Sequence, residues 1–446
     1  MYRYTGVLLA GLVLVGAWEY QTSHGRVGSS SDLQHKTAIT PALSKYIEDT
    51  LLKESIPGLA LGVFHAGGET EFGAWGKRTE DGDAMSTDTL FIIASCSKAF
   101  VSASIGILMD DYAHGRNVTP LPDNVTTFDW DTKVKDLLPE EWELMDKWAD
   151  SSASLRDILS HRTGLPRHDW SYGPYDTAED VVKRMKHLRP AYEFREQFSY
   201  NNLFYMLGAH LVSKYTGSYT QFVQDRIFDP LNMTSSTYSP DKAASSGKLT
   251  HAWANFGRRI PTWFTEKNAA ISNGPGGAIS SVEDLEKWVR MLMNGGIDPY
   301  TNTTIIPRSA FDAVTSAQVV ATGLTWPGVD SVVCYGLGWL RHSYLGHDAC
   351  LLPIIITPIM LICRVQIISH SGDIPGIATN IAFLPSEGLG IVVLTNIDET
   401  SFPTVDLPQR IIRDTFGHAT PSAKNSEIPL SPASTPATPF PSDDQY

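Results

Sequence analysis

The residues best placed to do chemistry are Ser95 and Lys98, which stand three positions apart in the stretch Ser95-Cys96-Ser97-Lys98. A serine hydroxyl is a poor nucleophile until a nearby base accepts its proton. Residues i and i+3 share one face of a helix, so the amine of Lys98 can reach the Ser95 oxygen. The positive end of that helix and partial burial both favour a lysine pKa below its usual range. The pair predicts a serine nucleophile that forms an acyl-enzyme.

A second group with suitable chemistry is Tyr200-Asn201-Asn202. A tyrosine hydroxyl beside Lys98 can pass the proton from the nucleophile to the leaving group. The side-chain amide of Asn202 can hold the lysine and also a substrate amide or carbonyl. The alternative is a tyrosine at the start of a helix with its hydroxyl in water.

The third group is His370-Ser371-Gly372, which precedes the last predicted hairpin. A small residue such as Gly372 lets an acyl group lie beside the strand backbone. The backbone amide of Asp373, together with that of Ser95, can donate to the oxyanion, and two such donors lower a barrier by about 3 kcal/mol. The alternative is a structural histidine at position 370.

Each of these three patterns also occurs elsewhere in the chain, so none is specific alone. An isolated S-x-x-K is usually a helix cap or a surface pair. The competing matches are Ser239/Lys242, Ser245/Lys248, Tyr300-Thr-Asn302 and His65-Ala-Gly67. Ser95 differs from the other serines because an apolar approach segment, residues 89–94, precedes it and an apolar helix follows it.

The elements that must position these groups are strands near both ends and helices between them. Thr40-Pro41 opens a helical pattern, and residues 59–64 and 71–75 predict a hairpin. Helix starts are predicted at Ser154 and Ser281. Residues 379–384 and 389–395 predict a second hairpin, and residues 403–417 predict a final helix. We therefore expect an α/β (α+β) fold, with an antiparallel sheet flanked by helices and an inserted all-helical subdomain at roughly 110–300.

The ordered set of motifs resembles the penicillin-recognising serine enzymes, above all class C β-lactamases and their penicillin-binding-protein and esterase relatives. The resemblance covers roughly residues 40–416. Further matching stretches are Asp88-Thr-Leu-Phe91, Leu159-Ser-His-Arg-Thr-Gly164, Asn273-Gly-Pro-Gly-Gly277, Tyr335-Gly-Leu-Gly-Trp339 and Pro375-Gly376.

This resemblance implies a β-lactamase/transpeptidase-like fold with its cleft between the two parts. It implies Ser95 as nucleophile and Lys98 with Tyr200 as the general-base pair, and it leaves open which of the two takes the first proton. It also implies that Asn202 and His370 line the cleft.

One departure from the family pattern shifts the expected substrate. Many β-lactam-processing members carry a lysine where His370 stands, and a neutral histidine removes a cation that would hold a β-lactam carboxylate. We expect a serine hydrolase that cleaves an ester, an amide or a D-amino-acid peptide. Two alternatives remain: an acyltransferase with the same Ser-Lys-Tyr set, and a secreted binding protein without turnover.

Composition narrows the expected partners and cofactors. The chain has 446 residues with 35 basic and 49 acidic side chains, and its net charge of −14 disfavours nucleic acid, which is bound through cations. Four cysteines in a chain of this length do not make a disulfide framework. No Cys/His spacing resembles a zinc site, so we expect neither a metal nor another cofactor.

The N-terminal residues indicate the secretory pathway. Residues 1–18 contain Arg3 and a short apolar run, typical of a signal peptide, with a signal anchor as the alternative. Residues 19–38 predict a linker to the catalytic domain, 39–417. N-glycosylation sequons begin at Asn117, Asn124, Asn232 and Asn302. Localisation in the secretory pathway or outside the cell is therefore expected.

Two segments fit a globular domain poorly. Residues 349–366 include an apolar run broken by two prolines, too short for a membrane span and awkward as a central strand. We interpret it as an insertion foreign to the fold, such as translated intron, against the alternative of a genuine buried strand. Residues 418–446 are rich in Pro, Ser and Thr and predict a disordered tail.

Overall fold

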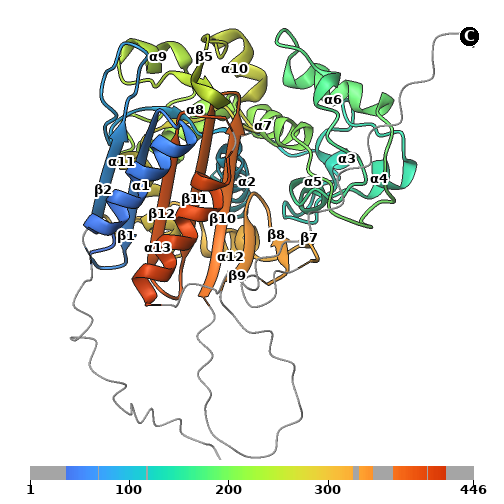
Figure 1. Cartoon of the computed structure of the whole chain (residues 1–446). Coiled ribbons are helices and arrows are strands. Elements are labelled where there is room, and N and C mark those ends of the chain that lie inside the picture. Colours follow the sequence, from blue (N-terminus) through green and yellow to red (C-terminus); the bar gives the residue numbers. More distant parts are fainter. Residues whose placement is uncertain are drawn as a thin grey trace, which may run out of the picture. The chain divides into compact units, whose positions relative to one another are not determined.

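An antiparallel sheet of eight strands carries the fold of the computed structural model, with the spatial order β2-β1-β12-β11-β10-β9-β8-β7 (Figure 1). The structure describes residues 37–68, 70–116, 119–324, 331–344, 365–398 and 400–417. The strands are β1 (Gly58–His65), β2 (Thr70–Gly76), β7 (Val319–Thr322), β8 (Val333–Tyr335), β9 (Leu340–Tyr344), β10 (Val365–Ile374), β11 (Ile377–Leu384) and β12 (Leu389–Thr395). The first two strands and the last six form one sheet, which confirms the predicted assembly from both ends of the domain.

The two faces of the sheet pack against different helices. Along β1, Leu59, Leu61 and Val63 join the apolar cluster formed with α1 (Pro41–Glu54) and α13 (Leu407–Phe416). Ala60 and Phe64 belong to the cluster on the opposite face, because successive side chains of a strand point to opposite sides. Figure 1 shows α1 and α13 on one face and α2 (Lys98–Ala113) and α11 (Val282–Met293) on the other.

The chain between α2 and β7 is mainly helical. Its helices are α3 (Val134–Leu137), α4 (Lys147–Ser152), α5 (Leu155–Leu159), α6 (Ala178–Arg184), α7 (Leu203–Thr216), α8 (Tyr219–Val223), α9 (Pro240–Ser245), α10 (Glu266–Ser272), α11 and α12 (Arg308–Thr315). Two short strand pairs accompany them, β3 (Phe91–Ile92) with β6 (Ile279–Ser280) and β4 (Ala252–Ala254) with β5 (Arg258–Ile260).

Several helices begin where capping side chains predict. The hydroxyl of Thr40 accepts from the Leu43 amide at the start of α1, and Ser281 caps α11 in the same way. Ser154 and Asp157 form a reciprocal capping box at α5. The predicted final helix of residues 403–417 is α13, which starts at Leu407 after a π-helical turn.

Some sequence predictions fall on residues that the structure does not describe. The predicted signal peptide, the tail 418–446 and residues 349–364 of the apolar segment lie outside the described residues. The predicted insertion ends too late, because Val365 and Gln366 already pair with Tyr344 and Ser343 in the β10–β9 ladder. Within the described ranges, no helix is both long and apolar enough to cross a membrane.

Candidate active site

A sharp turn after β3 presents Ser95. Within the predicted strand of residues 89–94, Phe91 and Ile92 form the ladder of β3, and Ala94 adopts a left-handed backbone conformation with φ +47°. A 3-10 turn, Ala94–Ser97, then leads into α2. The Thr379 hydroxyl donates to the Ile93 carbonyl at 3.1 Å and fixes the approach to the turn. Backbone strain of this kind persists only where the surroundings determine it.

Lys98 is fully buried, and its amine lies next to the Ser95 hydroxyl. Its Nζ is 3.0 Å from Ser95 Oγ, 2.8 Å from Asn202 Oδ1 and 2.8 Å from the Pro275 carbonyl oxygen. Burial is the largest cause that holds the pKa of Lys98 well below its usual range, and the Arg167 cation adds to it. The amide oxygen of Asn202 and the carbonyl of Pro275 can only accept. They therefore hold two N–H donors of Lys98, and the third position on its nitrogen faces Ser95 Oγ.

Tyr200 completes the contacts of the nucleophile. Its hydroxyl donates to Ser95 Oγ at 2.8 Å, and Lys98 Nζ lies 4.7 Å from the centre of its ring. Burial raises the pKa of the Tyr200 phenol, so the phenol keeps its proton at neutral pH. Ser95 Oγ thus lies within hydrogen-bond distance of both the Tyr200 hydroxyl and the Lys98 amine.

His370 is held as a neutral imidazole on β10. Its Nδ1 lies 2.6 Å from the Ser371 carbonyl oxygen, which can only accept, so Nδ1 carries the proton. Nε2 then accepts from the Tyr335 hydroxyl at 3.2 Å. Burial is the main cause that lowers the pKa of His370 to about 3, and the neighbouring Lys98 contributes. The side chain is buried, with 4% of its surface exposed.

Gly372 brings β10 against the Ser95 turn. A Cβ atom at this position would lie 2.2 Å from the Ile93 carbonyl oxygen and 3.1 Å from the Ala94 Cβ. Only glycine permits so close an approach. Asp373 follows on the same strand, pairs with Ala378 in the ladder to β11, and has an exposed side chain. The predicted residues of β10 therefore lie next to the turn that carries Ser95.

Sequence reasoning singled out the motif of His161 without giving it a role. His161 is fully buried and has a left-handed backbone, φ +60°. Its Nδ1 accepts from the Asn201 amide at 3.1 Å, and its ring centre lies 4.6 Å from that of Tyr200. Desolvation holds the pKa of His161 well below its usual value. The neutral imidazole ring of His161 packs against the Tyr200 ring.

The competing motif matches have structural roles. Ser239 caps α9, and Lys248 pairs with Asp88 at 2.8 Å. Tyr300 donates to Glu286, and His65 is the last residue of β1, followed by a turn at Ala66 and Gly67. Among the sequons, Asn124, Asn232 and Asn302 are exposed, as glycosylation requires, whereas Asn117 lies outside the described residues.

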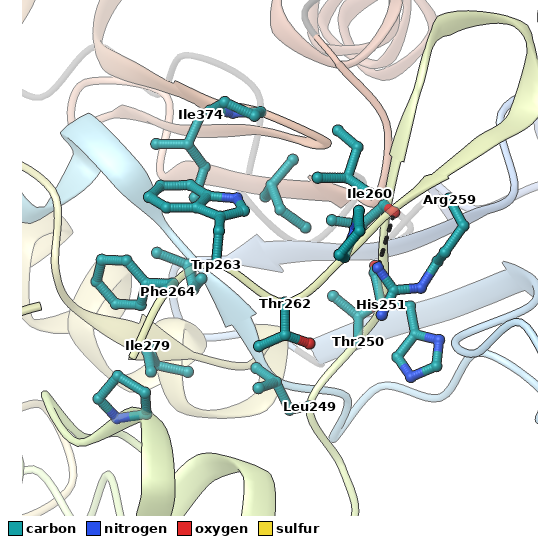
Figure 2. Close-up of a pocket in the computed structure, with 16 residues that line it drawn as sticks. Leu249, Thr250, His251, Arg259, Ile260, Thr262, Trp263, Phe264, Ile279 and Ile374 are labelled. Atoms are coloured by element: carbon teal, nitrogen blue, oxygen red, sulfur yellow. Dashed lines mark hydrogen bonds between the residues drawn. The ribbon is translucent and has the colours of Figure 1, made fainter. Parts of the chain in front are cut away.

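A small apolar cavity of about 50 Å³ lies at the β10–β11 turn, under the hairpin β4–β5. Figure 2 shows Trp263, Phe264, Ile279 and Ile374 around it. Ile374 is two residues beyond Gly372, and Ile92 of the lining is three residues before Ser95. Ser95, Lys98 and Tyr200 do not line this cavity. In the described part of the chain, no three His, Cys, Asp or Glu side chains gather as a metal site would require.

Solved structures with the same architecture support the assignment of the fold. The chain is similar to the octameric penicillin-binding protein homologue from Pyrococcus abyssi, with a TM-score of 0.66 and 18% identity, covering 84% of this chain and 77% of that one. It is also similar to the D-amino acid amidase from Ochrobactrum anthropi SV3 complexed with D-phenylalanine, with a TM-score of 0.63 and 19% identity over 85% of this chain and 99% of that one. These likenesses show the β-lactamase/transpeptidase-like fold.

Sequence comparison gives the family. An unguisins hydrolase of Aspergillus violaceofuscus is 29% identical over 88% of this chain and 67% of its own length, and one of Aspergillus campestris is 28% identical over 80% and 62%. The chain thus spans about two thirds of the length of these two relatives. A β-lactamase of Escherichia coli is 24% identical over 86% of this chain and 93% of its own. The model of the Beta-lactamase family matches residues 43–414, and the chain belongs to that family.

Proposed function

We propose that this protein is a serine hydrolase that forms an acyl-enzyme on Ser95. The observation that carries the proposal is the convergence of three groups, with Lys98 Nζ 3.0 Å and the Tyr200 hydroxyl 2.8 Å from Ser95 Oγ. In the neutral form of Lys98, the acceptors Asn202 and Pro275 take both N–H bonds, and the lone pair is directed at that oxygen. Half-burial of Ser95 keeps the nucleophile accessible.

In the proposed reaction, Ser95 Oγ bonds to the carbonyl carbon of the substrate while Lys98 takes the hydroxyl proton. The bond to the leaving oxygen or nitrogen then breaks, and that atom receives a proton from Tyr200, which regains one from Lys98. The amides of Ser95 and Asp373 are proposed to donate to the oxyanion. Water, activated by the same pair, cleaves the acyl-enzyme and releases the acid.

The neutral His370 favours substrates that need no cation on β10. We therefore propose an ester or amide, including D-amino-acid peptides, ahead of a β-lactam held by its carboxylate. A relative is named as an unguisins hydrolase, which supports a hydrolytic reaction, and a fold neighbour is named as a D-amino acid amidase, which supports an amide substrate.

The proposal is tested by presenting p-nitrophenyl esters, nitrocefin and D-alanyl peptides side by side to the wild-type protein and to Ser95→Ala. Turnover of at least one substrate that is lost in Ser95→Ala supports the proposal. Tyr200→Phe removes the shuttle hydroxyl and is expected to slow turnover by about 100-fold. A folded protein with no turnover and no acyl adduct would instead be a binding protein, and an acylated alcohol as product would indicate an acyltransferase.

A further inference from the structure

The segment Leu165–Asp169 contacts the stretch Tyr200-Asn201-Asn202. The side-chain amide of Asn201 donates to the Pro166 carbonyl at 2.7 Å and to the Leu165 carbonyl at 3.2 Å. The guanidinium of Arg167 lies 5.4 Å from the centre of the Tyr200 ring. Each of the first two residues of the stretch therefore has its own partner in this segment.

Asn202, the third residue of the stretch, has the carboxylate of Asp169 as its partner. Asn202 Nδ2 donates to Asp169 Oδ1 at 3.2 Å, while Asn202 Oδ1 accepts from Lys98 at 2.8 Å. A carboxylate can only accept, so it faces the NH₂ group of the amide and turns the oxygen toward the lysine. The other Asp169 oxygen accepts from Arg167 Nε at 2.7 Å. A continuous line of contacts thus joins Arg167, Asp169, Asn202, Lys98 and Ser95.

A local backbone feature supports this arrangement. His168, between Arg167 and Asp169, has a left-handed backbone with φ +49°. Its Nε2 lies 3.0 Å from the Arg189 carbonyl oxygen, and its own carbonyl accepts from the Ser171 amide at 2.8 Å. These contacts hold a conformation that histidine adopts at a cost.

We propose that Asp169 is a positioning residue, which holds the Asn202 amide so that its oxygen faces Lys98, and that Arg167 holds Asp169 in place. The inference rests on the proposed function, because its effect is exerted on the amine that activates Ser95. When the Asn202 side-chain amide is released from Asp169, it can flip and present its NH₂ group to Lys98. Lys98 then loses the acceptor that orients its amine.

The ion pair also acts on Lys98 by charge, with opposite signs from its two members. Arg167 lowers and Asp169 raises the pKa of Lys98. The other titratable groups around the amine are Tyr200, Tyr205, His161, His370 and Cys96, and they are uncharged near neutral pH. Burial raises the pKa of the Cys96 thiol to about 12 and raises that of both phenols, and it lowers the pKa of both imidazoles. Arg167 and Asp169 are therefore the charges whose removal should move the titration of Lys98.

The test measures the second-order rate constant with which a fluorophosphonate probe labels Ser95 in the full-length protein. In this reaction Ser95 Oγ bonds to phosphorus, fluoride leaves, and the proton passes to the Lys98–Tyr200 pair. Asp169→Ala removes the acceptor for Asn202, whereas Asp169→Asn keeps an acceptor oxygen and removes the charge. Asp131→Ala is the matched control, because Asp131 pairs with Arg156 at 3.0 Å and contacts no proposed active-site residue in the described chain.

We expect Asp169→Ala to label about 10-fold more slowly than the wild type, and Asp169→Asn and Asp131→Ala to stay within about threefold at the plateau pH. The labelling rate rises with pH as Lys98 loses its proton. The midpoint of this rise should move to lower pH in Asp169→Asn and to higher pH in Arg167→Met, because Asp169 raises and Arg167 lowers the pKa of Lys98. A merely structural role would not move the two midpoints in opposite directions.

Labelling of Asp169→Ala at the wild-type rate would overturn the inference and leave the proposed function standing. An equal fall in Asp169→Ala and Asp169→Asn would overturn it as well, because the charge and not the orientation would then matter. A wild-type protein that is folded and not labelled at Ser95 would overturn the proposed function, and this inference with it. Thermal unfolding of each variant establishes that it is folded.

Discussion

The Tyr335 hydroxyl donates to Nε2 of His370 at 3.2 Å, and the Ser371 carbonyl oxygen accepts a hydrogen bond from Nδ1–H at 2.6 Å. These two contacts hold the imidazole in its neutral form. The strand beside the nucleophile thus offers hydrogen bonding and shape to a substrate and no positive charge.

Replacing the His370 imidazole with a cation should change which of two covalent probes acylates Ser95 faster. His370→Lys is expected to accelerate acylation by a fluorescent penicillin, which carries a carboxylate, about 10-fold relative to acylation by an uncharged fluorophosphonate, because a charge-assisted hydrogen bond to the carboxylate becomes available. The ratio of the two acylation rates is the measurement, with His370→Gln as the uncharged control. An unchanged ratio would show that the substrate carboxylate does not approach position 370.

The pH dependence of acylation should report the buried lysine. Acylation needs Lys98 without its proton, and burial holds the pKa of Lys98 well below its usual 10.5. The rate should therefore rise with pH and level off well before pH 10.5. Stopped-flow labelling between pH 5 and 10 measures this limb, and a rate still rising in proportion to hydroxide at the top of that range would contradict it.

Acid should destabilise the fold through the buried histidines. The pKa of His370 is about 3 in the folded chain against 6.5 for the free side chain, so below pH 6.5 the unfolded state binds more protons. The stabilisation is complete above pH 6.5 and is lost as the pH falls toward 3. Between pH 7 and 4.5 we expect the free energy of unfolding to fall by about 2.5 kcal/mol from this residue.

Denaturant unfolding at both pH values measures the loss, and His370→Asn should lose less than the wild type by about that amount. Equal losses in the two proteins would mean that His370 is protonated in the folded state.

Close packing of β10 on the Ser95 turn should make Gly372 intolerant of any side chain. Gly372→Ala would place a methyl group 2.2 Å from the Ile93 carbonyl oxygen, and we expect a loss of about 2 kcal/mol of stability together with slow acylation. Gly323→Ala is the control, since its added atom would come no closer than 4.0 Å to a neighbouring side chain. Thermal unfolding compares the two, and equal melting temperatures would disprove the close contact.

The sequence predicted those parts of the fold that depend on local patterns. The hairpin of β11 and β12 follows from two apolar runs around Pro385–Gly388, and the start of α1 follows from Thr40 and Pro41. These features depend on residues close together in the sequence, because helix capping and the alternation of apolar and polar side chains along a strand are local patterns.

The order of motifs also indicated that Ser95, Lys98, Tyr200 and Asn202 belong together. It did not indicate their neighbours. Pro275 accepts from Lys98 through its backbone carbonyl, and no side-chain pattern can reveal that contact. Asp169 is an ordinary residue until the fold brings it to Asn202, more than 30 positions away. Tyr335 belongs to a stretch that the family resemblance singled out, but only the fold shows its contact with His370.

The most direct test of the account is to locate the covalent adduct. The protein is treated with a fluorophosphonate, digested, and mapped by mass spectrometry, alongside Ser95→Ala and Lys98→Met. The account predicts one adduct, on the peptide that contains Ser95, which is absent in the first variant and formed far more slowly in the second. An adduct on another residue, or labelling that persists unchanged in Ser95→Ala, would contradict it.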